Sequence, residues 1–294
     1  MRGLIIENIS NIYKVKINND IYEAIARGKF KKKEVTPIVG DIVDIEIIDE
    51  NSKKAVIENI EDRRVYIKRP KLANITQIIF VVSSKDPKPD LLMLDKQLAF
   101  SEFLGVKSII VLNKTDLDKE KYFEKIEEIY EKIGYTVIKT EAKKQNGIEN
   151  LQEYLKDNIS AFSGNSGVGK STLINSIFKK DVTQEGEISK RNKRGKNTTT
   201  AIKLYEIDEH TYIADTPGFS TFDISEIESK KLAMYFKEFE KYIPECEFIG
   251  CTHIKEKKCG IKIAIEEGKI SKERYKRFCK IYEELRKKEE RKKW

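Results

Sequence analysis

The eight residues GNSGVGKS, at positions 164–171 of a 294-residue chain, constrain its fold more than any other stretch. Gly164, Gly169, Lys170 and Ser171 have the G-x-x-x-x-G-K-[ST] spacing of a phosphate-binding loop. Such a loop needs a buried strand before it and a helix after it, because backbone N–H groups and the helix N-terminus together bind the anion. The apolar segments ISAFS and STLINSIF stand on its two sides. The sequence therefore predicts an α/β domain that binds a nucleotide.

The side chains of this loop have separable tasks. Lys170 is expected to reach the β- and γ-phosphates, and Ser171 to bind Mg²⁺. The other positions expected to contact the nucleotide are Gly164, Asn165, Ser166, Gly167, Val168, Gly169 and Thr172. A chance glycine-rich turn would explain the same letters, but not the apolar segments on either side.

A second motif, NKTD at residues 113–116, precedes the phosphate loop and directly follows the apolar segment SIIVL. It is therefore placed at the carboxyl end of a strand, where such sheets bind ligands. Asp116 can accept hydrogen bonds from the ring N–H and the exocyclic amine of guanine, whereas adenine presents a ring acceptor and no such amine. Asn113 would link this segment to the phosphate loop, and the stem of Lys114 would cover the base. The predicted base contacts are Asn113, Lys114, Thr115 and Asp116, with Ala142 and Lys143 in a second loop.

Two segments after the phosphate loop complete the expected nucleotide site. Asp215 begins DTPG and is expected to hold Mg²⁺ through water, and the N–H of Gly218 to sense the γ-phosphate. One threonine of GKNTTT should complete the Mg²⁺ shell when GTP is bound. We expect Thr199 in this role, with Thr198 and Thr200 as alternatives.

The order of these motifs is base reader, phosphate loop, first switch and second switch, whereas an ordinary GTP-binding domain begins with the phosphate loop. Each predicted site loop follows the carboxyl end of a strand. A circular permutation joins the termini of an ordinary domain and opens the chain at another loop, which leaves the sheet and the site loops in place. The sequence therefore predicts a circularly permuted P-loop GTPase domain. Its second switch runs within a few residues into the C-terminal part, which suggests direct transmission of the nucleotide state.

The hydrophobic pattern predicts a multidomain α/β chain in three parts. Residues 1–68 contain short alternating segments such as YKVKI and VDIEI, which favour an N-terminal OB-fold β-barrel that binds RNA. Residues 69–228 alternate apolar strands with helices, which predicts a doubly wound sheet. KRPKLANI is expected to be the linker between these parts. Residues 229–294 are predicted to form a helical zinc-binding domain.

The zinc prediction depends on CEFIGCTHIKEKKC, which has the spacing C-x4-C-x-H-x5-C. Cys246, Cys251, His253 and Cys259 supply three thiolates and one imidazole, a set that suits tetrahedral structural Zn²⁺. No coordination position is left open, so catalysis by this metal is not expected. The alternative is a group of scattered buried cysteines with a surface histidine.

Charge and composition limit where the protein acts. The formal net charge is +8, which favours an acidic partner such as RNA or a membrane surface. Residues 268–294 hold 12 Lys or Arg against 5 Asp or Glu, as in a solvated helix or an RNA-facing one. No apolar run reaches the roughly 18 residues of a membrane span. We expect a cytoplasmic monomer with no membrane partner.

The full set of motifs resembles the ribosome small subunit-dependent GTPase A family (RsgA, also called YjeQ or EngC). The resemblance rests on the OB-like start, NKTD, GNSGVGKS, RGKNTTT, DTPGFS and the Cys/His cluster followed by AIEEGKISKERYKRF. It implies GTP hydrolysis stimulated by the small ribosomal subunit, with 16S rRNA and its proteins as partners, during late 30S maturation. The implied cofactors are GTP or GDP, Mg²⁺ and one structural Zn²⁺.

Two positions depart from familiar patterns. The family usually has His where this sequence has Asn197, and Asn can orient a water but cannot act as a general base. Phe219 follows DTPG, where many small GTPases carry a water-orienting Gln. We therefore predict very slow intrinsic hydrolysis and name no catalytic base. Lys170, Thr199 and Asp215 are the expected catalytic residues, acting through electrostatic stabilisation.

Three alternatives remain open from the sequence. The chain could be an RNA-binding protein that uses GTP as a fixed cofactor, or a permuted GTPase of large-subunit assembly. The OB-like start and the zinc ligands disfavour the second of these. A generic P-loop ATPase is disfavoured by Asp116.

Overall fold

The computed structural model describes residues 1–294 except 29, 31–34, 180–201, 216–223 and 292–294, and of Asp215 it describes the backbone alone. The chain forms two compact units. The first contains Met1–Ile79, Ile148–Ser163 and Lys170–Phe219, and the second Phe80–Gly147, Gly164–Gly169 and Ser220–Trp294. Within the described residues, every helix is too short or too polar to cross a bilayer.

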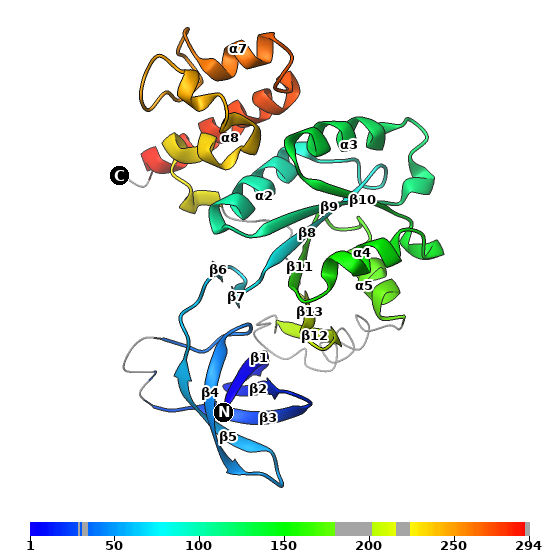
Figure 1. Ribbon diagram of the computed structural model, residues 1–294, viewed down its shortest axis with the longest axis vertical. Helices are drawn as coiled ribbons and strands as arrows, with labels where there is room; N and C mark the ends of the chain where they lie inside the picture. The colour runs from blue at the N-terminus through cyan, green and yellow to red at the C-terminus, as the bar shows by residue number, and fades with distance from the viewer. Residues whose placement is uncertain (29, 31–34, 180–201, 216–223, 292–294) are drawn as a thin grey trace. The chain divides into compact units, whose positions relative to one another are not determined.

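The first unit begins with a five-stranded barrel (Figure 1). Its strands are β1 (Arg2–Ile9), β2 (Ile12–Ile17), β3 (Asp20–Ala26), β4 (Ile42–Asp49) and β5 (Lys54–Ile60). They follow the order β1-β2-β3-β5-β4, and β4 pairs back onto β1, which closes the barrel. The β3–β5 pair is parallel and the other pairs are antiparallel. The OB-like barrel expected from the sequence is confirmed.

Alternation along the strands builds the interior of the barrel. Tyr13 and Val15 of β2 are buried, as are Val43 of β4 and Ile57 of β5, while their sequence neighbours lie nearer the surface. Successive strand side chains point to opposite faces, so the period-two pattern places one face in the core. The barrel therefore follows directly from the local sequence.

The stretch expected to be a linker contains most of a short hairpin. β6 (Tyr66–Lys68) pairs with β7 (Lys71–Ala73) in a separate two-stranded sheet. Ile67, Leu72 and Ala73 are buried, and the N–H of Ala73 donates to the carbonyl of Val39 at 3.0 Å. The sequence did not indicate this hairpin, because its few apolar residues are surrounded by charged ones.

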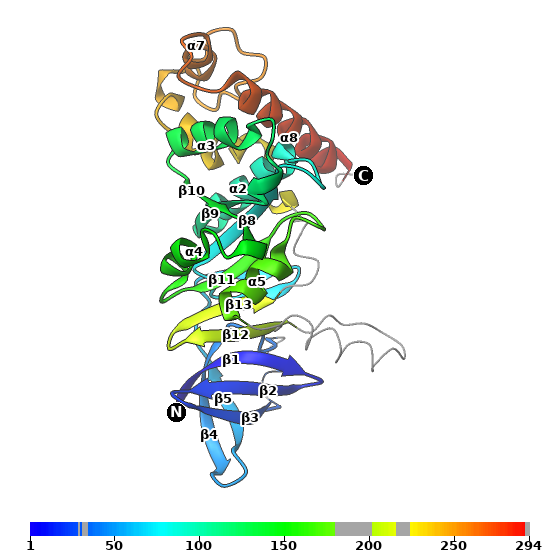
Figure 2. The same ribbon diagram turned by 90° about the vertical axis from the view of Figure 1, so that its right-hand side faces the viewer.

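The rest of the first unit is part of an α/β sheet. It contains the start of β8 (Gln77–Ser83), β11 (Ile159–Ser163), β12 (Lys203–Asp208) and β13 (Thr211–Asp215), with helices α4 (Ile148–Leu155) and α5 (Lys170–Phe178). β11 and β13 are parallel, and β12 is antiparallel to β13. β12 also pairs with β1 of the barrel, where Glu7 lies opposite Lys203 (Figure 2).

The second unit contains the other strands of the α/β part of the chain. It contains the end of β8, β9 (Lys107–Asn113) and β10 (Thr136–Thr140), with α2 (Leu91–Leu104), α3 (Tyr122–Ile133) and the turns η1 (Thr115–Leu117) and η2 (Ala142–Lys144). The strand order is β10-β9-β8, and β9 and β10 are parallel. Every residue of β8 is buried, as its continuous apolar run predicts. Helices α2 and α3 end at Gly105 and Gly134 in the left-handed conformation, as expected for helix termini.

The C-terminal part of the second unit is a series of short helices. η3 (Ile224–Glu226), η4 (Ser229–Tyr235), η5 (Lys237–Phe239) and η6 (Ile243–Glu245) precede α7 (Gly260–Glu266) and α8 (Lys272–Arg291). The part predicted to be helical thus begins with a run of 3-10 turns, interrupted at Phe236, whose backbone is extended. Phe236 and Phe239 both pack edge-on against Phe278 of α8. Ala99 and Phe100 of α2 belong to the same hydrophobic core.

A buried ion cluster joins α2 to α8. Arg274 is fully buried and donates to the carboxylates of Asp95 on α2 and Glu238 on η5. Arg277 donates to Asp95 as well, and the hydroxyl of Tyr130 donates to Asp95 at 2.6 Å. The guanidinium of Arg274 also lies over the ring of Tyr130, at 5.2 Å from its centroid. Each charge therefore has partners, as buried charges require.

Candidate nucleotide site and metal centre

The phosphate-loop residues 164–169 connect β11 to α5, and their backbone demands glycine at two places. Gly164 and Gly169 have φ angles of 145° and 99°, which side-chain-bearing residues rarely adopt. A Cβ at Gly164 would lie 2.3 Å from the carbonyl oxygen of Val81, and one at Gly169 would lie 2.3 Å from Nδ2 of Asn113. The loop can therefore pass close to its neighbours only because these side chains are missing.

Asn113, the last residue of β9, links three segments. Its Nδ2 donates to the carbonyl of Val168 in the phosphate loop at 2.9 Å. Its Oδ1 accepts from the hydroxyl of Thr140 at 3.1 Å and from the N–H of Ala142 at 3.4 Å. Asn113 is buried, so these bonds are shielded from water. The base-reading segment and the phosphate loop, 55 residues apart, thus meet through one side chain.

Lys114 adds a second link to the phosphate loop. Its ammonium donates to the carbonyls of Gly167 and Asp86, both at 2.7 Å. Its backbone is left-handed, with φ of 64°. The contact with Asp86 could not be predicted from the sequence, because any residue can supply a backbone carbonyl acceptor.

The remaining base-side residues lie around η1 and η2. Asp116 is exposed on η1, open to a ligand, and Thr115 beside it is half-buried. Ala142 of η2 is buried and Lys143 is exposed. Lys144 forms an ion pair with Glu141, and this carboxylate and then Asp116 raise the pKa of Lys144.

Lys170 and Ser171 begin α5 directly after the loop, which places the positive end of the helix beside the loop N–H groups. Lys170 is half-buried, and burial lowers the pKa of its ammonium. An anion bound beside it would favour the charged form. Ser171 and Thr172 are exposed on the first turn.

The metal-ligand candidates converge in the second unit. The ligand atoms of Cys246, Cys251, His253 and Cys259 all lie within 4.8 Å of one another. Nδ1 of His253 is 3.5 Å from Sγ of Cys246 and 3.4 Å from Sγ of Cys259, and these two sulfurs are 3.9 Å apart. Tetrahedral Zn²⁺ with bonds of about 2.0–2.3 Å needs ligand separations of this size. Three sulfurs and one imidazole fit zinc in both chemistry and spacing.

Comparison with known proteins bears on the whole chain. Residues 60–225 match the model of the RsgA GTPase, and residues 2–57 match that of the RsgA N-terminal domain. The chain belongs to the RsgA GTPase family. Proteins named "Small ribosomal subunit biogenesis GTPase RsgA" are 38% identical in Alkaliphilus metalliredigens and 42% identical in Clostridium botulinum. The first alignment covers 97% of this chain and 98% of the relative, and the second covers 97% of both.

Solved structures agree with this assignment. YjeQ from Thermotoga maritima superposes with a TM-score of 0.84 at 37% identity, covering 97% of this chain and 98% of that one. YloQ, described as a circularly permuted GTPase, gives 0.82 at 28% identity, covering 98% of this chain and 95% of that one. The predicted fold, an OB-like barrel with a permuted GTPase domain, is therefore confirmed. As a member of the RsgA GTPase family, the protein is a GTP hydrolase.

Several residues expected to serve an RsgA GTPase fall outside the described residues. They are Thr198, Thr199, Thr200, Gly218, Asn197 and Phe219. Asp215 ends β13, which agrees with its expected place at a strand's carboxyl end. The passage from the second switch to the C-terminal part also lies outside the described residues, and Ile224, which follows it, is buried in a core that includes Ala99 and Phe100 of α2.

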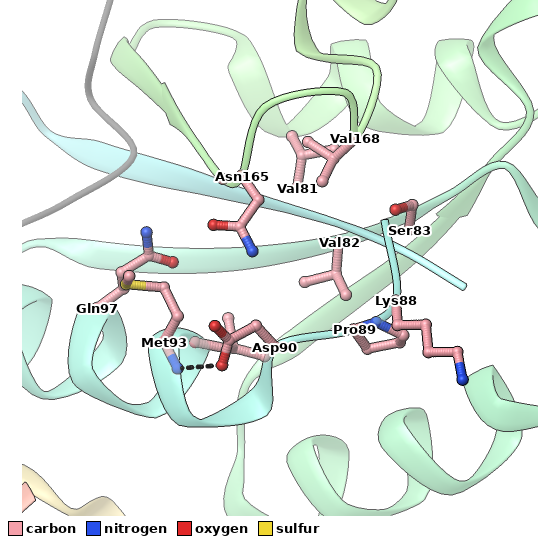
Figure 3. Close-up of a pocket in the computed structure, with 12 residues that line it drawn as sticks. Val81, Val82, Ser83, Lys88, Pro89, Asp90, Met93, Gln97, Asn165 and Val168 are labelled. Carbon is pink, nitrogen blue, oxygen red and sulfur yellow. Dashed lines mark hydrogen bonds between the residues drawn. The ribbon is translucent and has the colours of Figure 1, made fainter. Parts of the chain in front are cut away.

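A small pocket lies beside the phosphate loop of this RsgA GTPase. It is lined by the end of β8, the start of α2 and the loop residues Gly164, Asn165 and Val168. Figure 3 shows the Asn165 amide pointing toward α2, near Gln97 and Asp90. Asp90 caps α2 by accepting from the N–H of Met93 at 2.9 Å. Asn165 therefore lines this pocket together with residues of α2.

Burial also shapes the metal centre of the family fold. Burial raises the pKa of the Cys251 thiol to about 12 and lowers the pKa of His253. A bound divalent cation would lower the pKa of the Cys251 thiol, because it binds the thiolate. It would also favour the neutral imidazole of His253, as burial does.

Proposed function

We propose that this RsgA-family GTPase acts on the small ribosomal subunit, which stimulates its GTP hydrolysis during a late stage of subunit maturation. The observation that carries the proposal is the similarity to proteins named for small-subunit biogenesis. Their sequence identity to this chain is 38–42%, and the alignments cover 97% of it. The similarity includes the barrel as well as the GTPase domain. The net charge of +8 suits an RNA partner.

The proposed division of labour follows the three sequence segments. Residues 1–68 would bind ribosomal RNA, residues 69–228 would bind and hydrolyse GTP, and residues 229–294 would carry a structural zinc ion. The site of action would be the cytoplasm, and the working form a monomer.

The nucleotide would lie between the base-reading segment and the phosphate loop. Asp116 would accept from guanine, Lys114 would cover the base, and Lys170 would meet the β- and γ-phosphates. Further contacts would come from Asn113, Thr115, Ala142, Lys143, Gly164, Asn165, Ser166, Gly167, Val168, Gly169, Ser171, Thr172, Thr198, Thr200 and Gly218. The two hydrogen bonds of Lys114 and the one from Asn113 to Val168 support this arrangement, because they keep the two segments together.

Magnesium would be held by Ser171, Thr199 and Asp215, of which Asp215 acts through water. The ion would neutralise charge on the phosphates, and Lys170 would stabilise the charge that develops on them. No side chain of the described residues is assigned as a general base. With Asn197 and Phe219 at positions where water-orienting groups are common, intrinsic turnover should be slow.

The proposed zinc ligands are Cys246, Cys251, His253 and Cys259. The metal would fix the ends of two loops and supply no catalysis, because all four coordination positions are filled by protein.

The decisive experiment measures multiple-turnover GTP hydrolysis while purified small subunits are titrated in. We expect a very low rate alone and a saturable rise with small subunits. Large subunits serve as the matched control and should give no rise. Stimulation by large subunits alone would indicate the other class of permuted assembly GTPase, and no stimulation by either would refute the proposal.

Competition between nucleotides tests the base assignment independently. GDP and GTP should displace a fluorescent guanine nucleotide, whereas ATP at the same concentration should not. Equal competition by ATP would contradict the role given to Asp116.

A further inference from the structure

The metal centre contains a carboxylate that is not among the ligand candidates but organises the loop around His253. Oε1 of Glu256 accepts from the N–H and the hydroxyl of Thr252, at 2.9 and 2.8 Å. Its Oε2 accepts from the N–H groups of Ile254 and Lys255, both at 3.0 Å. One side chain thus satisfies four donors on both sides of a ligand residue.

The carbonyl groups of the same loop accept hydrogen bonds from side chains of two helices. Lys262 of α7 donates to the carbonyls of Ile254 and Glu256, at 2.9 and 2.8 Å. The hydroxyl of Tyr275 of α8 donates to the carbonyl of His253 at 2.7 Å. The loop is therefore fastened to two helices while Glu256 fixes its N–H groups.

His253 needs such support. Its φ of 62° lies in the left-handed region, which residues with side chains adopt uncommonly. N–H groups that converge in a turn make a concavity that suits an anion. Burial opposes the ionisation of Glu256, but its hydrogen bonds with Thr252 and Ile254 lower its pKa to about 2. Glu256 is therefore a carboxylate at neutral pH.

We propose that Glu256 is the positioning residue of the metal centre: it holds residues 252–255 so that His253 faces the three cysteines before the metal binds. A ligand loop that is already ordered loses little conformational freedom on binding. The same hydrogen bonds must break before the loop can open and release the ion. The inference rests on the proposed zinc site and is independent of GTP hydrolysis.

The test uses the full-length protein carrying Glu256→Gln. Glutamine has the same size, but its amide N–H₂ would face N–H donors, so one pair of hydrogen bonds is lost. Zinc affinity should fall about 10–100-fold, as for other residues that orient metal ligands, and zinc transfer to a chromophoric chelator should become faster. In protein loaded with Co²⁺, the visible absorption typical of tetrahedral thiolate coordination should weaken or shift, which a loss of overall stability alone would not cause.

Glu247→Gln is the matched control. It removes the same charge from the neighbouring ligand loop, but the Glu247 side chain makes an exposed ion pair with Lys258 at 2.9 Å. Zinc release from this variant should stay close to that of the wild type. Equal release rates and equal Co²⁺ spectra in the Glu256 and Glu247 variants would overturn the proposal.

Thr252→Val provides a second route if the glutamine variant does not fold. It removes one donor to Glu256 and leaves the carboxylate in place, so zinc release should rise only a few-fold. An unchanged rate would count against the proposal. Wild-type protein purified without zinc would overturn it together with the metal site, whereas the result with small subunits would be unaffected.

Discussion

Two polar clusters in the second unit join segments that are far apart in the sequence, and they differ in what surrounds them. In the first, Arg274 reaches Asp95, 179 residues away, and both are fully buried. In the second, Asn113 reaches Val168 and Lys114 reaches Gly167, beside the exposed carboxylate of Asp116. We name these the closed cluster and the open cluster.

The difference separates structure from ligand binding. In the closed cluster the charged groups pair with one another, since the carboxylates of Asp95 and Glu238 both accept hydrogen bonds from arginine. The open cluster uses its bonds to hold backbone in place and leaves the Asp116 carboxylate exposed. Polar groups that satisfy one another stabilise a fold, whereas a carboxylate held in place but left exposed can bind a ligand. Mutations in the first should therefore change stability, and mutations in the second should change nucleotide affinity.

The largest effect is expected from Arg274→Met. The change takes the Arg274 donors from the buried Glu238 carboxylate and leaves Asp95 with Arg277 and Tyr130. Breaking one side of a buried ion pair costs about 3–5 kcal/mol. Urea denaturation followed by fluorescence should show a strongly lowered midpoint, whereas the GDP affinity of the protein that remains folded should change little.

Lys276→Met is the control for this prediction. Lys276 lies on the same helix and pairs with Glu273 at 2.9 Å, but both side chains are more than half exposed. Exposed pairs of this kind contribute about 0–1 kcal/mol. Similar midpoints for the two variants would show that the closed cluster does not hold α8 to α2.

A smaller effect, of a different kind, is expected from Asp116→Ala. The ring N–H and amine of guanine would lose a charged acceptor, which costs about 1–3 kcal/mol, on the order of 5- to 150-fold in GDP affinity. Because Asp116 is exposed, the urea midpoint should not change. Isothermal titration with GDP measures the affinity.

Glu124→Ala removes a nearby exposed carboxylate, which pairs with Lys121 at 3.3 Å, and should leave GDP binding unchanged. A loss of affinity in both variants would point to general electrostatics rather than base recognition.

The sequence predicted what depends on neighbouring residues. The period-two segments became the barrel strands β2 and β4, the continuous apolar run became the buried β8, and Gly105 and Gly134 end the helices. Motif spacing predicted the family, because a phosphate loop and a metal knuckle are local in sequence. The four Cys and His positions could be chosen without knowing the fold.

Contacts between distant residues were not readable in the same way. Arg274 and Arg277 were part of a basic helix that the sequence described as solvated or RNA-facing, yet both point inward to Asp95. A charge count cannot identify a partner on another helix. The acceptor at Asp86 and the hairpin at residues 66–73 were missed for a related reason, since backbone carbonyls and brief apolar segments leave little trace in composition.

The smallest effect is expected from Lys114→Met, which sharpens the comparison most. Methionine keeps most of the apolar stem but loses both hydrogen bonds, to Gly167 and Asp86. Because these bonds are exposed to water, the net loss should be about 1 kcal/mol, roughly fivefold in GDP affinity. Isothermal titration should detect this change, while the urea midpoint stays that of the wild type. A midpoint lowered as far as in Arg274→Met would mean that the open cluster also holds the fold together. Exposure to solvent would then not distinguish the polar contacts that serve a ligand from those that serve the structure.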